Sequence, residues 1–95
     1  MELNTTSFTI DIQKNCQEGE VTCDNISYTG TRKSDGSQIH LIGHTLNNKN
    51  TFDLYGYTFK NGDYTYSIYI QSAEFILEKN GKVIVAEKGE WSEGN

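Results

Sequence analysis

Apolar and polar residues alternate along most of the chain, in segments separated by turns that contain glycine. In the first clear segment, Phe8, Ile10 and Ile12 fall on one side, with threonine, aspartate and glutamine on the other. A period of two is typical of a strand with one buried face. No proline interrupts the chain, and the pattern leaves little room for a helix. We therefore predict an all-β chain whose first strand passes through Phe8–Ile12.

The clearest hairpin signal lies between Tyr55 and Tyr69, on either side of Asn61-Gly62. Asparagine and glycine both tolerate positive φ, so this pair predicts a type I′ turn. Such a turn puts most of the aromatic residues on one face, which fixes the buried side of both strands. The expected pairs are Lys60 with Asp63, Phe59 with Tyr64, Thr58 with Thr65, Tyr57 with Tyr66, and Tyr55 with Ile68.

Two further turn signals, Asp35-Gly36 and Asn80-Gly81, predict hairpins of their own. The second hairpin carries apolar residues on both faces, which indicates a more central position in the sheet. Its register sets like charges opposite each other near both ends, so a slipped register is an open alternative. The expected pairs are Arg32 with Ile39, Gly30 with Leu41, Tyr28 with Gly43, Leu77 with Ile84, Ile76 with Val85, Phe75 with Ala86, Lys79 with Lys82, and Glu74 with Glu87.

Strands joined by short turns at this spacing predict an antiparallel meander of about seven to eight strands. We expect one β-domain over residues 1–95, as a closed or partly open β-barrel, with a β-sandwich as the alternative. The apolar side changes between Cys23 and Ile26, which predicts a β-bulge near Asp24-Asn25. We expect the polar loop Asn47–Asn50, which has no apolar anchor, to be mobile, and the chain to fray after Trp91.

Thirteen acidic residues outnumber eight Lys and Arg residues, for a formal net charge of −5. Nucleic acid is therefore excluded as an expected partner, because phosphate binding needs clustered cations. A basic protein, or no partner, fits the charge better. No apolar stretch reaches the roughly 18 residues of a membrane span, and residues 1–20 lack an export signal pattern. If the chain is exported, its signal peptide has been removed.

The only two cysteines, Cys16 and Cys23, flank a short polar segment. A two-residue type II′ turn at Gly19-Glu20 would place them directly opposite each other on a hairpin. We therefore predict a disulfide, and with it a periplasmic or secreted location. The spacing is not that of a redox motif, and no second Cys/His pair stands at zinc-ligand spacing.

Motifs for catalysis are missing from the sequence. The two histidines, His40 and His44, would lie on one strand face about 13 Å apart, too far to share a metal ion. The carboxylates are dispersed, and no nucleophile motif or phosphate-binding glycine loop is present. We expect no enzyme activity, no metal and no cofactor.

Four residues are candidates for partner binding: Glu18, Glu20, Tyr69 and Trp91. Glu18 and Glu20 lie on the turn that the disulfide would preorganise. Tyr69 points away from the aromatic ladder, with Leu54 as its expected partner, and exposed Tyr and Trp are typical anchors for proteins or sugars. Alternatively, Tyr69 covers a second core layer and Trp91 plugs an open end of the barrel.

An acidic, disulfide-bridged barrel of this size resembles the small periplasmic proteins of Gram-negative bacteria, among them the membrane-bound and periplasmic lysozyme inhibitors. The resemblance is carried by Cys16, the Asp35-Gly36 hairpin, Asn61–Tyr66, Asn80–Val85 and the late Trp91, and it covers the overall plan of most of the chain. The Ser- and Tyr-bearing loop of those inhibitors has no counterpart here, so no inhibitory residue is carried over.

Two classes of function follow. The first is a binding module for a basic protein, such as an inhibitor or immunity protein of a cationic hydrolase, with Glu18 and Glu20 at the contact. The second is a small-ligand or glycan-binding barrel that uses Tyr69, Trp91 or an internal cavity, although large internal aromatic residues argue against a sizeable cavity. An envelope protein with no discrete site is a third possibility.

Overall fold

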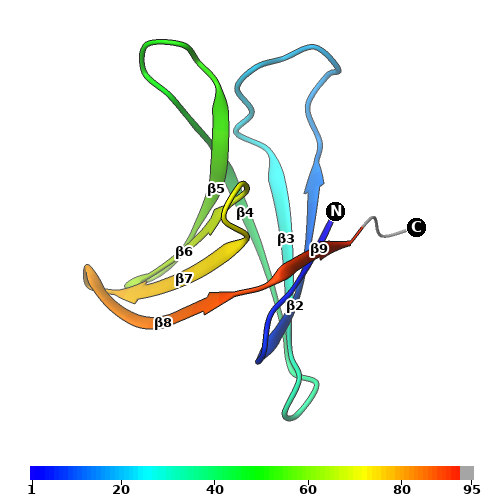
Figure 1. Ribbon diagram of the computed structural model, residues 1–95, viewed down its shortest axis with the longest axis vertical. Coiled ribbons are helices and arrows are strands. Elements are labelled where there is room, and N and C mark those ends of the chain that lie inside the picture. The colour runs from blue at the N-terminus through cyan, green and yellow to red at the C-terminus, as the bar shows by residue number, and fades with distance from the viewer. Residues whose placement is uncertain (93–95) are drawn as a thin grey trace.

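The computed structural model describes residues 1–92, which form nine strands and no helix. The strands build one antiparallel sheet in the order β8-β7-β6-β5-β4-β3-β2-β1-β9, which curls into a nearly closed barrel (Figure 1). The predicted all-β meander barrel is confirmed. The strands are β1 (Glu2–Asn4), β2 (Phe8–Lys14), β3 (Ile26–Arg32), β4 (Gln38–Asn47), β5 (Leu54–Asn61), β6 (Tyr64–Tyr69), β7 (Glu74–Lys79), β8 (Lys82–Lys88) and β9 (Glu90–Ser92).

Both ends of the chain differ from the expectation. The strand predicted to be first is β2, because the short β1 precedes it and pairs with it antiparallel, Leu3 opposite Ile10. The chain does not fray immediately after Trp91, since Ser92 still pairs with Glu2 of β1. Residues 93–95, the rest of the tail expected to fray, lie outside the described residues.

The barrel closes where β8 ends and β9 begins. Gly89, between them, donates its N–H to the carbonyl of Ala73 at 2.8 Å. A Cβ on Gly89 would overlap the Asn4 carbonyl, so only glycine fits this close approach. Nearby, the Glu87 carboxylate accepts hydrogen bonds from the Ser7 N–H at 3.0 Å and the Ser7 hydroxyl at 2.7 Å. We call these contacts, together with the pairing of β1 with β9, the seam of the barrel.

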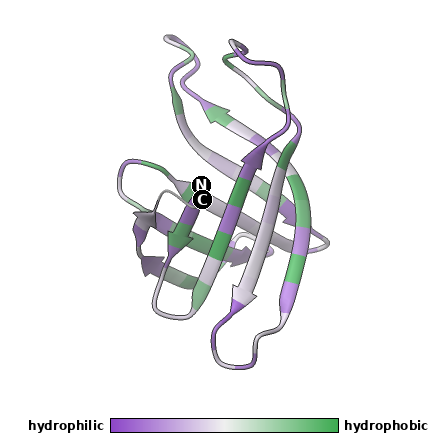
Figure 2. Cartoon of the chain, turned by 90° about the vertical axis from the view of Figure 1, so that its right-hand side faces the viewer, coloured by the Kyte–Doolittle hydropathy of each residue, from purple (hydrophilic) through white to green (hydrophobic). Residues whose placement is uncertain are grey.

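The core lies inside the barrel and follows the alternation of the sequence (Figure 2). Ile10 and Ile12 of β2 are buried, and Phe8 packs against the core from the same face, as predicted. Each such large apolar side chain stabilises the fold by roughly 1.5–3 kcal/mol when fully buried. The buried apolar residues are Leu3, Ile10, Ile12, Cys23, Ile26, Tyr28, Tyr57, Phe59, Ile68 and Phe75.

The aromatic hairpin of β5 and β6 has the predicted buried face but a register two residues away from the prediction. Phe59 lies opposite Tyr66 rather than Tyr64. The two-residue turn is Gly62-Asp63, and φ is positive at Gly62 (62°) but not at Asn61. Glycine at the first central position suits a type II′ turn, so the predicted type I′ turn is wrong. A shift of two leaves a side chain on the same face, which is why Tyr57, Phe59 and Ile68 were still identified as inward.

The hairpin of β3 and β4 shifts in the same way. Gly30 lies opposite Ile39, not Leu41, and Arg32 donates its N–H to the Ser37 carbonyl at 2.9 Å. Residues 33–36 therefore form the connection, instead of Asp35-Gly36 alone. The Asp35 carboxylate accepts hydrogen bonds from the N–H and hydroxyl of Ser37, at 3.0 and 2.8 Å, which stabilises this longer turn.

The last hairpin turns at Asn80-Gly81, as predicted, and φ values of 52° at Asn80 and 80° at Gly81 fit a type I′ turn. Lys79 faces Lys82, as expected, but the register then shifts between Leu77 and Glu78. The shift moves Lys88, in place of Glu87, opposite Glu74. It therefore exchanges a like-charge pair for an opposite-charge pair.

The expected central position of this hairpin is wrong, because β8 lies at the edge of the sheet order. Val83 and Ile84 are accordingly 55% and 50% exposed. Their apolar character reflects strand propensity rather than a second buried face.

Candidate functional site

Two long loops lie at the same end of the barrel, as both views show (Figures 1 and 2). One spans residues 15–25 and joins β2 to β3, and the other spans residues 48–53 and joins β4 to β5. The short turn between β3 and β4 lies at the opposite end. We call the surface formed by residues 15–25 and 48–53 the loop end.

The predicted disulfide between Cys16 and Cys23 is confirmed, with Cα atoms 6.0 Å apart. The predicted hairpin around it is wrong, because pairing of β2 with β3 stops at Lys14 opposite Ile26. The Glu20 N–H bonds to the Gln17 carbonyl at 3.3 Å, and Gly19 has a φ of 95°. The turn therefore runs from Gln17 to Glu20, and Gly19 is its third residue, where a type II turn needs positive φ. Its central residues are Glu18 and Gly19, not the predicted Gly19 and Glu20.

The expected β-bulge near Asp24-Asn25 is also wrong. Both residues precede the first residue of β3 and lie in the loop. Cys23 and Ile26 are both buried because the chain between them is irregular. No strand has to change its face at this point.

Hydrogen bonds through Asn47 fix the two loops to each other. The Asn47 side-chain amide donates to the carbonyls of Val21, in the first loop, and Phe52, in the second, each at 3.0 Å. Its carbonyl oxygen accepts a hydrogen bond from the Thr45 hydroxyl at 2.6 Å. The Thr45 N–H donates a hydrogen bond to the Cys23 carbonyl at 2.8 Å, and the Thr45 hydroxyl accepts one from the Cys23 N–H at 3.0 Å. The disulfide, β4 and both loops thus form one connected unit.

This unit exposes two apolar side chains. Val21 is 56% exposed and Phe52 is 59% exposed. Phe52 also has a φ of 63°, a left-handed conformation that costs a non-glycine residue on the order of 1–3 kcal/mol. Strain at a residue that buries little of its own side chain points to a role outside the core.

Phe52 was not among the candidate residues, because Asn47–Asn50 is polar and the segment was interpreted as a loop with no apolar anchor. The Asn48 side chain accepts hydrogen bonds from the N–H groups of Asn50 and Thr51, at 2.8 and 3.2 Å. These bonds turn the chain so that Phe52 follows the polar residues and faces outward. A single phenylalanine beside four polar residues was the only signal in the sequence.

The two loops also carry exposed acidic side chains. Glu18, Glu20 and Asp24 belong to the first loop and are exposed, as is Asp53 of the second loop, whereas Lys49 is the one cation of the two loops. A recess at the loop end is lined by residues that include Glu20, Asp24 and His44. The predicted candidates Glu18 and Glu20 are therefore on the same surface as Val21 and Phe52.

The other two candidates, Tyr69 and Trp91, belong to neither loop. Tyr69 stacks on Tyr55 outside the core, with ring centroids 6.4 Å apart and planes 7° apart. Tyr69 pairs with Gly56 rather than Leu54. Tyr55 was predicted to lie in the inward ladder opposite Ile68, but it is 47% exposed, because Gly56 and Tyr57 are the residues buried at the start of β5.

Trp91 packs partly buried against the core cluster and donates its indole N–H to the carbonyl of Ile70 at 2.8 Å. This contact ties β9 to the connection between β6 and β7. The alternative in which Trp91 plugs an open end of the barrel stays a prediction.

The histidines are exposed on β4, and His40 shares a hydrogen bond with the Thr29 hydroxyl at 3.1 Å. Within residues 1–92, no three His, Cys, Asp or Glu side chains are grouped as metal ligands would be. The same residues include no helix of the length and apolarity that crossing a membrane requires.

Comparisons with protein-family models, with curated proteins and with solved structures gave no match. The resemblance to the lysozyme inhibitors stays a prediction.

Proposed function

We propose that this protein is a binding module that docks its loop end onto a basic protein. The observation that carries the proposal is the joining of both loops by Asn47, whose amide binds the backbone carbonyls of the exposed residues Val21 and Phe52 in loops that also carry four carboxylates. Stable protein interfaces have this layout, with an apolar centre and a polar rim.

Each part of the loop end has a physical role in this proposal. Phe52 acts as the anchor, since buried aromatic side chains dominate binding energy at interfaces. The disulfide and the Asn47 hydrogen bonds hold the loops in place before binding, which lowers the entropy lost on association. Glu18, Glu20 and Asp24 attract a cationic partner and speed the encounter.

An inhibitor or immunity protein of a cationic hydrolase is the form of this function that we favour. A narrow, rigid loop end can enter a concave active site, and the exposed phenylalanine can fill a pocket there. The disulfide supports an oxidising compartment, and we propose the periplasm or the extracellular space.

The test is biolayer interferometry with the oxidised protein immobilised and a panel of cationic hydrolases that includes lysozymes in solution. The variants Phe52→Ala and Glu18→Lys/Glu20→Lys probe the anchor and the charged rim. Asp63→Lys/Glu90→Lys makes the same change in net charge at exposed residues away from the loop end and serves as the matched control. Each interaction is measured at low and high salt.

A partner is expected to lose about tenfold or more in affinity with Phe52→Ala, as for a central aromatic residue. Glu18→Lys/Glu20→Lys is expected mainly to slow association, and added salt should do the same to the wild type. If the control variant weakens binding as much as Glu18→Lys/Glu20→Lys, net charge rather than the loop end is responsible. Absence of binding across the panel counts against the hydrolase form of the proposal.

A second candidate function is supported by the stacked Tyr55 and Tyr69 rings. A shallow surface beside them is lined by Gln71, Ser72 and Glu74, and exposed rings with polar neighbours suit the apolar face of a sugar. A glycan array probed with the wild type and Tyr69→Ala tests this alternative. Binding lost in Tyr69→Ala but insensitive to salt would favour a glycan ligand.

A further inference from the structure

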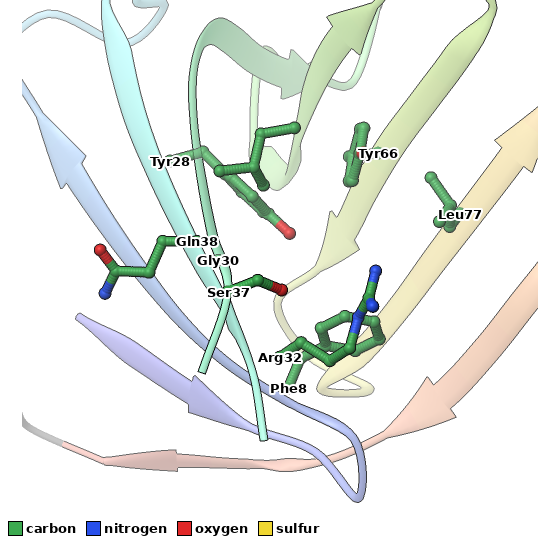
Figure 3. A pocket seen from close by; sticks show the side chains of 9 residues that line it. Phe8, Tyr28, Gly30, Arg32, Ser37, Gln38, Tyr66 and Leu77 are labelled. Atoms are coloured by element: carbon green, nitrogen blue, oxygen red, sulfur yellow. The ribbon is translucent and has the colours of Figure 1, made fainter. Parts of the chain in front are cut away.

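A cavity of about 220 Å³ lies inside the barrel, beside the turn between β3 and β4. That turn is at the end opposite the loop end (Figure 1), and Figure 3 shows the side chains that line the cavity. Residues from five strands line it, among them Phe8, Tyr28, Arg32, Ile39, Tyr66 and Leu77. The cavity is below the roughly 300–1,000 Å³ of sites for drug-sized ligands, so any occupant is small.

Aromatic rings form much of the wall. The rings of Tyr28 and Tyr66 have centroids 5.5 Å apart at 58°, and both residues line the cavity. Gly30 is needed here, because a Cβ at that position would lie 2.7 Å from the Tyr28 hydroxyl oxygen. Glycine therefore allows the Tyr28 side chain to lie along β3 and end at the cavity.

The Tyr28 hydroxyl points into this space (Figure 3). Tyr28 as a residue is 2% exposed, and it is one of the side chains that line the cavity. Burial, with a smaller contribution from Tyr66, raises the pKa of Tyr28 far above its ordinary value. The hydroxyl therefore stays protonated and can donate a hydrogen bond to a ligand.

Arg32, the single arginine of the sequence, supplies positive charge at the mouth of the cavity. It lies opposite Phe8 in the register of β2 and β3, and its guanidinium nitrogens lie at the cavity in Figure 3. One nitrogen is 3.3 Å from the Asp35 carboxylate in an exposed ion pair. A guanidinium has five N–H donors, so this contact leaves donors for a second carboxylate.

We propose that the cavity binds a small aromatic carboxylate, with its ring against Tyr28 and Tyr66 and its carboxylate on Arg32. An apolar cavity of about 150 Å³ accepts benzene, so 220 Å³ holds one ring with a short acidic side chain. The cavity is separate from the loop end, and its occupancy does not depend on the protein partner proposed above.

The experiment is an NMR titration of the isotope-labelled oxidised protein with phenylacetate, followed through the backbone amides. The neutral isostere 2-phenylacetamide tests the requirement for charge. The variants are Arg32→Gln and Tyr28→Phe, and Lys82→Gln is the matched control because it removes an exposed cation from β8. The amide spectrum of each variant verifies that it is folded.

Phenylacetate is expected to cause saturable shifts at Gly30, Ser37 and Leu77 near millimolar concentration, and to bind about tenfold more tightly than phenylacetamide. Arg32→Gln should remove that difference, and Tyr28→Phe should weaken both ligands by severalfold. Lys82→Gln should change neither affinity. The proposal is overturned if shifts are absent at the cavity, if they occur only at the loop end or Tyr69, or if Arg32→Gln keeps the preference for the carboxylate.

Discussion

The contact between Glu87 and Ser7 joins residues 80 positions apart and closes the barrel, so its removal should weaken the whole fold. Glu87→Ala deletes two hydrogen bonds to a charged acceptor, each on the order of 1.5–3 kcal/mol. Because Glu87 is only half-buried, solvent screening reduces this contribution. We expect a loss of about 2 kcal/mol in the free energy of unfolding, or roughly 8–16 °C in Tm for a domain of this size.

The effect should depend on pH. Burial alone would raise the pKa of Glu87, but the hydrogen bonds from Ser7 and the nearby Lys33 ammonium outweigh it, so the pKa is lowered. A lowered pKa in the folded state means that the ionised carboxylate stabilises the fold above about pH 4.3, the ordinary value for glutamate. That stabilisation is lost as the pH falls through the folded pKa. The difference between the wild type and Glu87→Gln should therefore be largest near neutral pH and shrink below about pH 4.

Urea denaturation, followed by the fluorescence of the single tryptophan, Trp91, measures both effects at the seam itself. Glu90→Ala is the control, since Glu90 is an exposed glutamate on β9, the next strand along the chain. The reasoning is refuted if Glu90→Ala costs as much as Glu87→Ala. It is also refuted if the difference between the wild type and Glu87→Gln is the same at pH 3 as at pH 7.

Three further outcomes are expected. Reduction of the Cys16–Cys23 disulfide should lower the free energy of unfolding by about 2.5 kcal/mol, the loop-closure value for a loop this short. A thermal melt with and without reductant measures the loss, and an unchanged Tm would contradict it. Gly43→Ala should lower the free energy of unfolding, measured by urea denaturation, by at least about 2 kcal/mol, because the added Cβ would overlap the Thr58 carbonyl. A loss under about 0.5 kcal/mol would mean that β4 and β5 separate easily there. Phe52→Gly should raise the free energy of unfolding by roughly 0.5–1 kcal/mol, because glycine adopts the left-handed backbone conformation without strain. The same variant should weaken partner binding, because it removes the aromatic anchor. A loss of stability would mean that Phe52 contributes to the fold instead.

The buried faces of the strands could be predicted from the sequence because alternation determines which residues share a side. The register could not, as the β5–β6 hairpin illustrates. Turns centred on Asn61-Gly62 and on Gly62-Asp63 differ by two residues in register and bury the same side chains, so the hydrophobic pattern does not distinguish them. At Asn80-Gly81 both residues have positive φ, and there the predicted position of the turn was confirmed.

The candidate site was predicted in part. The disulfide and the acidic residues Glu18 and Glu20 could be identified because two cysteines in a short acidic segment are a local pattern. The role of Asn47 could not, because its amide bonds to backbone carbonyls on two loops that only the folded barrel brings together. The cavity was also missed, since it depends on how the Tyr28 ring passes Gly30 inside the barrel.

The seam also has a consequence for the order of folding. Every pairing in the sheet joins strands that follow one another along the chain, except the pairing of β1 with β9. Local hairpins close small loops and can form early, whereas contacts between distant residues carry the largest loop-closure cost. During synthesis the sheet would therefore curl from its N-terminal hairpins and remain open until Trp91 had emerged. Closure of the barrel would be the last event, and the tryptophan that reports it is one of the residues that completes it.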